Sequence, residues 1–189
     1  MGVLLVLAGP SGVGKGTIVR NLLARDSRLW FSVSATTRSR REDEVDGRDY
    51  VFIDRSEFER LRDAGGFLEW FDVYGDLKGT PRAPVEEHLA AGDDVLLEID
   101  VQGALTVKRA FPDALLVFVK APSREEQRRR LLDRKQDDPE AIERRLAEAE
   151  EEEQAADRFD AVVVNDDADR AASEVAAILA GQRRATPPS

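Results

Sequence analysis

The sequence predicts an α/β fold in which helices cover both faces of a parallel sheet, giving three layers. Short aliphatic runs alternate with helical patterns along most of the 189 residues, and this alternation is typical of a parallel sheet. A glycine-rich turn joins the first aliphatic run to the first helical pattern. Residues 36–80 break the alternation with short strands, which indicates an insertion folded as a small mixed α/β lobe.

Each expected element follows from its hydrophobic pattern and from the residues that end it. Strands are expected where aliphatic residues run together, at 3–8, 31–35, 50–53, 67–74, 95–99, 115–119 and 161–164. Helices are expected at 17–24, from the capping box at Ser56 to about 65, at 85–91, at 104–110, from the capping box at Ser123 to about 156 with an interruption at 135–139, and at 170–179. The stretches 38–49 and 75–84 are predicted to be loops. The chain therefore divides into a core of residues 1–35 and 81–181, a lobe of residues 36–80 and a disordered tail of residues 182–189.

Composition excludes several classes of protein. The net charge of −10 argues against a nucleic-acid partner, because phosphate backbones require a basic face. The absence of cysteine excludes disulfides and thiolate metal sites, and the single histidine, His88, is predicted to be structural. The longest apolar run, Val3 to Ala8, is too short to span a bilayer. We expect a cytoplasmic protein with no membrane partner. Arg128, Arg129 and Arg144 are expected to lie on a solvated helix surface.

The stretch GPSGVGKGT, residues 9–17, has the form of a phosphate-binding loop of the Walker A type. It follows a hydrophobic strand and opens a helix, so backbone N–H groups and the helix N-terminus can converge on a phosphate. Lys15 would meet the β- and γ-phosphates of a bound nucleotide. Gly16 stands where Ser or Thr normally supplies an oxygen to Mg²⁺, which leaves the direct metal ligand open, with Thr17 one position later.

Further segments, in order and spacing, carry a resemblance to one family. They are residues 32–50 (SVSATTRSRREDEVDGRDY), 67–70 (FLEW), 79–80 (GT), 98–103 (EIDVQG), Arg134 and Arg145, and 164–167 (VNDD). Together with the phosphate loop, this pattern resembles the guanylate kinases, P-loop NTPase-type nucleoside monophosphate kinases. The resemblance implies transfer of the γ-phosphate of ATP to GMP and dGMP with Mg²⁺. It also implies that residues 36–80 bind GMP and that residues from about 124 to 156 form a helical lid.

The resemblance also implies roles for individual residues. Lys15, Arg134 and Arg145 would be catalytic. ATP would be bound by Asn165 and by the loop residues Gly9, Pro10, Ser11, Gly12, Val13, Gly14, Lys15, Gly16 and Thr17. GMP would be bound by Ser34, Arg38, Arg41, Glu44, Tyr50, Glu69, Lys78, Thr80 and Asp100. Thr17 and Asp100 are candidates to contact Mg²⁺, directly or through water. Asp100 and Glu98, at the carboxyl end of an expected strand, are candidates to orient the waters of Mg²⁺ or the GMP site.

The chemistry of these residue types agrees with the implied roles. Guanine presents two neighbouring N–H donors, and the carboxylate of Glu69 could accept from both while Ser34 or Thr80 donates to the guanine carbonyl. Adenine presents an acceptor instead, so the same carboxylate would reject it. Arginine at positions 38 and 41 suits a phosphate dianion, because the guanidinium fork binds it in two places.

Two positions depart from the family pattern, and two alternative functions stay open. Lys78 stands where the family often has Tyr, and Lys135 where Gly usually follows the first lid arginine. One alternative is a related P-loop kinase with another acceptor, such as a ribose bisphosphate. The other is a guanylate-kinase-like binding module without catalysis. The sequence allows a monomer or a small homo-oligomer.

Overall fold

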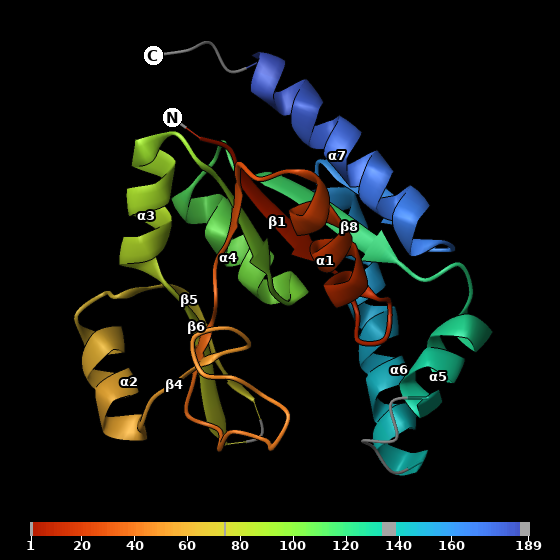
Figure 1. Cartoon of the computed structure of the whole chain (residues 1–189). Coiled ribbons are helices and arrows are strands. Elements are labelled where there is room, and N and C mark those ends of the chain that lie inside the picture. Colours follow the sequence, from red (N-terminus) through yellow and green to blue (C-terminus); the bar gives the residue numbers. More distant parts are fainter. Residues whose placement is uncertain (1, 74, 134–138, 186–189) are drawn as a thin grey trace.

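The computed structural model describes residues 2–73, 75–133 and 139–185, and it contains two sheets (Figure 1). The larger sheet has five strands in the order β2-β7-β1-β8-β9, and every neighbouring pair in it is parallel. Its strands are β1 (Leu4–Ala8), β2 (Leu29–Phe31), β7 (Asp94–Glu98), β8 (Leu115–Lys120) and β9 (Ala161–Val164). The predicted α/β fold with a parallel core sheet is confirmed.

Helices cover both faces of this sheet, which explains why the interiors of its central strands are apolar at successive positions. On one face α1 (Lys15–Arg25) and α7 (Ala168–Ala185) enclose a core with alternate side chains of β1 and β8. On the other face α3 (Arg82–Ala91) and α4 (Val101–Ala110) pack on the intervening side chains. All five residues of β1 are buried, as a strand between two helical layers requires.

The small lobe has its own sheet and core. Its strands follow the order β4-β3-β6-β5, with bounds Val51–Phe52, Ala35–Thr36, Asp76–Pro81 and Phe67–Val73. Helix α2 (Arg55–Asp63) covers the sheet, and Phe58 stacks on Phe67 in the lobe's core, with ring centroids 4.3 Å apart. This sheet is mixed, because β6 pairs antiparallel with β3 and β5 whereas β3 and β4 pair in parallel.

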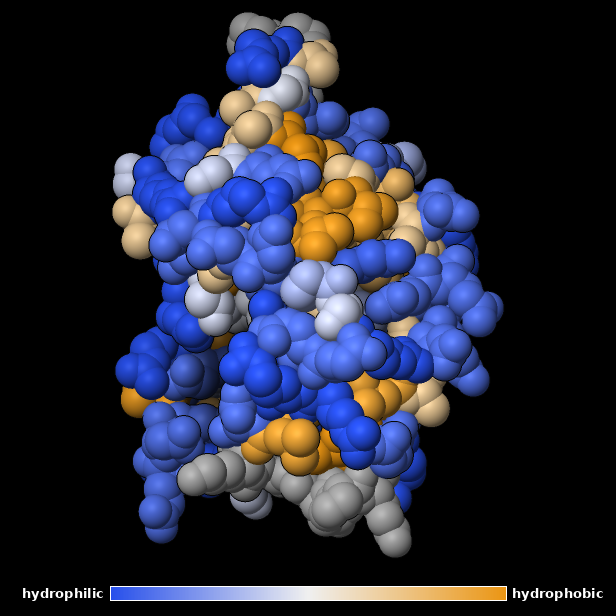
Figure 2. Space-filling model, turned by 90° about the vertical axis from the view of Figure 1, so that its right-hand side faces the viewer, coloured by the Kyte–Doolittle hydropathy of each residue, from blue (hydrophilic) through white to orange (hydrophobic). Residues whose placement is uncertain are grey.

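A pair of helices, α5 (Arg124–Asp133) and α6 (Pro139–Glu153), extends from the same end of the large sheet as the small lobe (Figure 1). Leu131, Ile142 and Leu146 form the core of this pair. A short 3-10 helix, η1 (Ala156–Arg158), leads from α6 into β9. The molecular face that carries these helices is mostly hydrophilic, with separate small apolar areas (Figure 2). No helix in the described part of the chain is long and apolar enough to cross a membrane.

The structure corrects four details of the sequence reading. The strand expected at 31–35 is two strands in different sheets, because the chain leaves the core after Phe31 and enters the lobe at Ala35. The loop expected at 75–84 contains β6 and the start of α3. The N-cap of α2 is Asp54 and not Ser56, since the Asp54 carboxylate accepts from the N–H of Glu57 at 2.8 Å. Ser123 caps α5 as expected, because its hydroxyl accepts from the N–H of Glu126 at 3.2 Å, but the Glu126 carboxylate accepts from Arg129 and Arg130 and does not close the capping box.

The fourth correction concerns the C-terminal tail. Residues 182–185 belong to α7, and the rest of the expected disordered tail lies outside the described residues. The side chain of Arg183 forms ion pairs with Asp26 and Asp94, at 2.6 and 2.5 Å. The other oxygen of Asp94 accepts from the N–H of Val3 at 2.7 Å. A charged residue near the end of the chain therefore joins α7 to the start of the sheet.

Candidate active site

The phosphate-loop sequence forms a tight turn between β1 and α1. Gly9 and Gly14 show why side chains are excluded there. A Cβ on Gly9 would lie 2.2 Å from the carbonyl oxygen of Val119, and Gly14 has a φ of 90°, in the left-handed region that favours glycine. Gly14 is also the N-cap of α1, so the helix opens at Lys15 with its first N–H groups directed at the loop. The loop thus has the geometry of an anion site.

The side chain of Lys15 folds back over the start of this loop. Its ammonium donates to the carbonyl oxygens of Gly9 and Pro10, at 2.5 and 3.1 Å. The neighbouring Thr17 hydroxyl accepts from the guanidinium of Arg20 at 3.0 Å. Both side chains lie at the loop, as the sequence predicted.

Three side chains of α5 and α6 contact the outside of the loop. Arg145 donates to the hydroxyl of Ser11 at 3.2 Å, so one of the two predicted lid arginines is already at the loop. The buried Gln127 donates to the carbonyl oxygen of Ser11 at 2.7 Å, and Arg130 donates to that of Val13 at 3.1 Å. The other predicted lid arginine, Arg134, lies outside the described residues.

Gln127 and Arg130 were not among the predicted site residues. Arg130 is half-buried, whereas Arg128, Arg129 and Arg144 are exposed, as expected. The helical position distinguishes Gln127 and Arg130 from the exposed arginines, because Gln127, Arg130 and Leu131 share one face of α5 at the i, i+3, i+4 spacing. That face packs on the phosphate loop.

Asn165, directly after β9, is buried against the same loop. Its side-chain amide donates to the carbonyl oxygen of Val13 at 2.8 Å, and its backbone carbonyl accepts from Arg130 at 2.9 Å. Its side-chain oxygen has no hydrogen-bond partner among the described residues. The predicted Asn165 therefore lies at the phosphate loop and retains an unused acceptor there.

Carboxylates gather beside the loop at the ends of β7 and α6. The oxygens of Glu98 lie 3.6 and 3.8 Å from the position that a Cβ would take on Gly16. Asp100 is the N-cap of α4 and accepts from the N–H of Gly103 at 2.7 Å. Burial raises the pKa of the Glu152 carboxyl, and Asp100 adds to this rise while Lys15 opposes it. Glu152 was not predicted as a site residue; it shares one face of α6 with Arg145.

In the small lobe, a carboxylate is buried next to a hydroxyl. Glu69 on β5 is 5% exposed and accepts from the hydroxyl of Thr80 on β6 at 2.5 Å. Burial raises the pKa of Glu69 to about 7; the hydrogen bond from Thr80 and the charge of Lys78 oppose the rise, and Asp100 adds to it. Ser34 is buried in the same lobe, just before β3. The lobe thus contains the predicted hydrogen-bond donors and acceptor for the polar edge of a nucleotide base.

Gly103 on α4 is a point of close approach between this lobe and the core. A Cβ there would lie 3.3 Å from both Asp100 Oδ1 and Glu69 Oε2, and 3.1 Å from the Phe71 ring. The absence of a side chain at Gly103 therefore lets β5 approach α4, and it brings the carboxylates of Glu69 and Asp100 to one place. The sequence had included Gly103 in a motif without a role.

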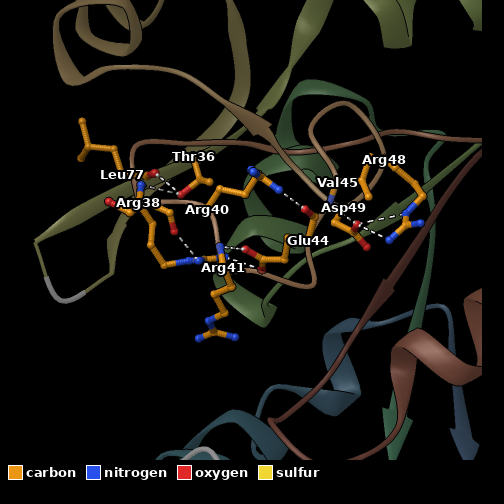
Figure 3. A network of polar contacts seen from close by, with 10 residues as sticks. Thr36, Arg38, Arg40, Arg41, Glu44, Val45, Arg48, Asp49 and Leu77 are labelled. Carbon is orange, nitrogen blue, oxygen red and sulfur yellow. Dashed lines mark hydrogen bonds and ion pairs between the residues drawn. The ribbon is translucent and has the colours of Figure 1, made fainter.

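The predicted phosphate arginines lie in the loop that follows β3 (Figure 3). Arg38 forms an ion pair with Glu44 at 2.6 Å, and the second oxygen of Glu44 accepts from the backbone N–H of Arg41 at 2.8 Å. The pairing with Arg38 lowers the pKa of Glu44. The guanidinium of Arg41 points away from this network (Figure 3). Glu44 therefore holds the shape of the arginine loop.

Tyr50 lies beside Arg38. The Arg38 guanidinium is 5.5 Å and the Lys78 ammonium 5.2 Å from the centre of the Tyr50 ring. Because Lys78 and Thr80 lie on β6 and β6 pairs with β3 and β5, this sheet connects Arg38 and Tyr50 to Glu69. Arg38, Tyr50, Lys78, Thr80 and Glu69 come from four separate segments of sequence, and the lobe brings them together.

The parallel sheet, the glycine loop and Lys15 define a P-loop protein of the kind that binds nucleotide phosphates, with a second polar lobe at the same end of the sheet. The family model for guanylate kinase matches residues 1–182, and the chain belongs to the guanylate kinase family.

Individual relatives agree with this assignment. A guanylate kinase of Thermus thermophilus is 54% identical over 183 residues, which cover 97% of this chain and 83% of that protein. The guanylate kinase of Rubrobacter xylanophilus is 52% identical over 178 residues, covering 94% and 93% of the two chains. The crystal structure of guanylate kinase from Anaplasma phagocytophilum is similar with a TM-score of 0.79 at 36% identity, covering 96% of this chain and 86% of that one.

Proposed function

We propose that this protein transfers the γ-phosphate of ATP to GMP, yielding ADP and GDP, and that it uses dGMP less well and AMP barely. Family membership and relatives about half identical in sequence support this activity. The observation that carries the substrate assignment is the buried Glu69–Thr80 pair, at 2.5 Å. It lies on the same small sheet as Lys78, whose ammonium is 5.2 Å from the ring centre of Tyr50. Arg38 lies over the same ring. This combination offers a base-reading group and a phosphate-binding group to one ligand.

At the donor end, the loop amides and the N-terminus of α1 would bind the phosphates of ATP. Lys15 would exchange its contacts with the Gly9 and Pro10 carbonyls for the β- and γ-phosphates. Arg145, now on the Ser11 hydroxyl, would neutralise charge on the transferred group, together with Arg134. The unused oxygen of Asn165 could accept from the adenine amino group.

At the acceptor end, ionised Glu69 would accept from the two N–H donors of guanine, with Ser34 or Thr80 donating to the guanine carbonyl. Arg38, Arg41, Tyr50 and Lys78 would bind the GMP phosphate. Glu44 would act by fixing Arg38 and the Arg41 backbone, because its own charge repels a phosphate.

The family generally needs a divalent metal, and the residues at the loop fit Mg²⁺. Thr17, Glu98 and Asp100 offer only oxygen donors, which Mg²⁺ prefers. The part of the chain that the structure describes holds no group of three His, Cys, Asp or Glu side chains that could bind an ion alone. We infer that such an ion would take the rest of its ligands from ATP phosphates and water, and that it would neutralise charge on the γ-phosphate.

The reaction needs no catalytic base from the protein. A phosphate monoester has a second pKa of about 6, so the attacking oxygen of GMP is already an anion at neutral pH. What remains is alignment and stabilisation of charge, which Lys15 and Arg145 can supply. Movement of α5 and α6 toward the small lobe would exclude water, which otherwise competes with GMP for the phosphoryl group.

Release of ADP, measured with a coupled assay across nucleoside monophosphates, tests the function. We expect turnover with GMP, less with dGMP and almost none with AMP. Turnover with a different acceptor and none with GMP would favour a related P-loop kinase. Binding of GMP without turnover would favour a non-catalytic module. The cytoplasmic location, the oligomeric state and the lack of nucleic-acid or membrane partners stay predictions.

A further inference from the structure

The peptide group between Ser11 and Gly12 lies where the phosphate loop meets α5. The side-chain amide of Gln127 donates to the carbonyl oxygen of Ser11 at 2.7 Å, and among the described residues Gln127 alone donates to that oxygen. Gln127 is 1% exposed, so the hydrogen bond forms in the interior, where an unpaired amide would be costly. The orientation of the Ser11 carbonyl is therefore tied to a side chain of α5.

The N–H of Gly12 belongs to the same peptide group. A trans peptide is planar, and its C=O and N–H point in opposite directions. Because the Ser11 carbonyl points toward α5 on the outside of the loop, the Gly12 N–H points to the inside. Gly12 is buried, and in the described part of the chain its N–H has no hydrogen-bond partner. A buried N–H without a partner is rare in proteins, so this group is available to a ligand of the loop.

Glycine at position 12 leaves this peptide group free to rotate. The φ of Gly12 is 82°, and because glycine adopts positive and negative φ with similar ease, the C=O and N–H could exchange sides. No larger residue fits, since a Cβ on Gly12 would lie 2.8 Å from Cγ of Leu131 on α5. The backbone itself therefore does not select the orientation of the peptide, and the hydrogen bond from Gln127 does.

The carbonyl of Val13, two residues further on, is held differently. It accepts from both Arg130 and Asn165, at 3.1 and 2.8 Å, so the loss of one donor would leave the other. The Ser11 carbonyl has one donor among the described residues and no substitute for it. A single substitution at Gln127 should therefore release the Ser11–Gly12 peptide and leave the rest of the loop in place.

We propose that Gln127 is a positioning residue for the donor nucleotide: its hydrogen bond to Ser11 keeps the N–H of Gly12 directed at the phosphates in the loop. This inference rests on the proposed use of ATP and adds a side chain outside the loop that orients one of the amides within it. A hydrogen bond from an N–H group to a charged acceptor is stronger than one to a neutral acceptor. Release of this amide should therefore weaken phosphate binding, although Gln127 lies on the other side of the loop.

Binding calorimetry with ADP and with GMP tests the proposal in the intact protein, because ADP would occupy the phosphate loop without transferring a phosphate. Gln127→Met keeps the length of the side chain and removes the donor. We expect the dissociation constant for ADP to rise about tenfold and that for GMP to stay unchanged. Gln154→Met makes the same exchange at an exposed position after α6 and should change neither constant.

Nuclear magnetic resonance can observe this peptide group by itself, because Ser11–Gly12 is the only Ser–Gly pair in the sequence. Protein made by cell-free synthesis with isotope labels on the serine carbonyl carbon and the glycine nitrogen gives one signal for it. In the wild type, ADP should move the Gly12 amide proton downfield, because the N–H gains an acceptor. In Gln127→Met most of that movement should be lost.

An unchanged ADP constant in folded Gln127→Met would overturn the proposal, and so would equal weakening of ADP and GMP binding, which would mean a general disturbance of the fold. An undiminished movement of the Gly12 signal would show that Gln127 only anchors α5. Failure of the proposed function looks different, because the wild type would then bind ADP without phosphorylating GMP, and the ADP measurements would still decide the role of Gln127. Circular dichroism shows whether each variant is folded, and Gln127→Leu replaces Gln127→Met if the latter does not fold.

Discussion

Thr80 donates a 2.5 Å hydrogen bond to Glu69 in the interior of the small lobe. The hydrogen bond stabilises the ionised carboxylate, yet burial outweighs it and raises the pKa of Glu69 to about 7. The group thus changes charge near neutral pH in the absence of ligand. Guanine, which presents two N–H donors, would favour the ionised form, so ligand binding and loss of a proton should be linked.

Glu69→Gln should impair the use of GMP far more than it impairs the fold. The amide keeps one acceptor and places a donor where guanine also donates, which leaves buried groups unpaired. We expect kcat/KM for GMP to fall about 100-fold. Steady-state kinetics with GMP, IMP and AMP measures the change, and IMP, which lacks the 2-amino group, should lose less. A variant that retains the full preference for GMP would show that Glu69 does not read the base.

The same substitution should change how stability depends on pH. The pKa of Glu69 is about 7 in the folded protein and 4.5 in the reference state. Between pH 4.5 and pH 7 the folded protein therefore keeps a proton on Glu69 that the unfolded chain has released. The contribution of Glu69 to the free energy of unfolding is therefore fully present below pH 4.5 and is lost as the pH rises through 7. That loss amounts to about 3 kcal/mol. Urea denaturation at pH 4.5 and pH 8 should show Glu69→Gln gaining stability relative to wild type at the higher pH. An equal difference at both values would contradict the raised pKa.

The sequence predicted those features of the fold that depend on residues close together in the chain. The aliphatic run before Gly9 and the glycines after it identify β1 and the loop, because burial on both faces and backbone angles act over a few residues. The helix cap at Ser123 is likewise a local contact, between residues three positions apart. By contrast, β6 was read as a loop, because Gly79 and Pro81 interrupt its pattern, although its pairing with β5 and β3 makes it the strand that carries Lys78 and Thr80.

Contacts between distant segments could not be read from the sequence. The buried Gln127 is polar inside an arginine-rich helix, and only its contact with the Ser11 carbonyl, 116 residues away, explains it. The role of Gly103 depends on the approach of β5. Arg183 was assigned to a disordered tail on the basis of its position near the end of the chain, while its partners Asp26 and Asp94 lie far away in sequence.

Lys15→Met should abolish phosphoryl transfer while the protein remains folded. The methionine keeps the length of the side chain and removes the charge that would stabilise the transferred phosphate. We expect kcat to fall at least about 100-fold. Loss of the hydrogen bonds to the Gly9 and Pro10 carbonyls should lower the melting temperature by only about 2–4 °C. Turnover close to that of the wild type would exclude Lys15 from catalysis.

Gly103→Ala should damage the acceptor site although the substitution is small. The methyl group would lie 3.3 Å from the carboxylate oxygens of Glu69 and Asp100, closer than ordinary contact allows, and would push β5 from α4. We expect KM for GMP to rise about tenfold and KM for ATP to stay within about twofold. Gly181→Ala is the matched control, because nothing lies within 4 Å of its Cβ position; it should stabilise α7 by about 0.5–1 kcal/mol and leave both KM values unchanged. Equal changes in KM for ATP and GMP would contradict a role confined to the acceptor lobe.

Arg183→Ala should lower stability and leave catalysis unchanged. The substitution removes the partner of Asp94, whose side chain is only 8% exposed, and of Asp26. Because a buried carboxylate without its cation is costly, we expect a loss of about 2–3 kcal/mol at pH 7. The pairing with Arg183 lowers the pKa of Asp26, so that part of the stability is present at neutral pH and is lost in acid. Arg184→Ala, at the exposed next position, should change stability by less than about 0.5 kcal/mol. Urea denaturation of the two variants at pH 7 and pH 3 measures the difference in stability.

The GMP kinetics of both variants should equal those of wild type, because Asp94 begins β7 at the end of the sheet opposite the phosphate loop. A reduced kcat in folded Arg183→Ala would mean instead that this ion-pair network influences the active site through α7 and α1.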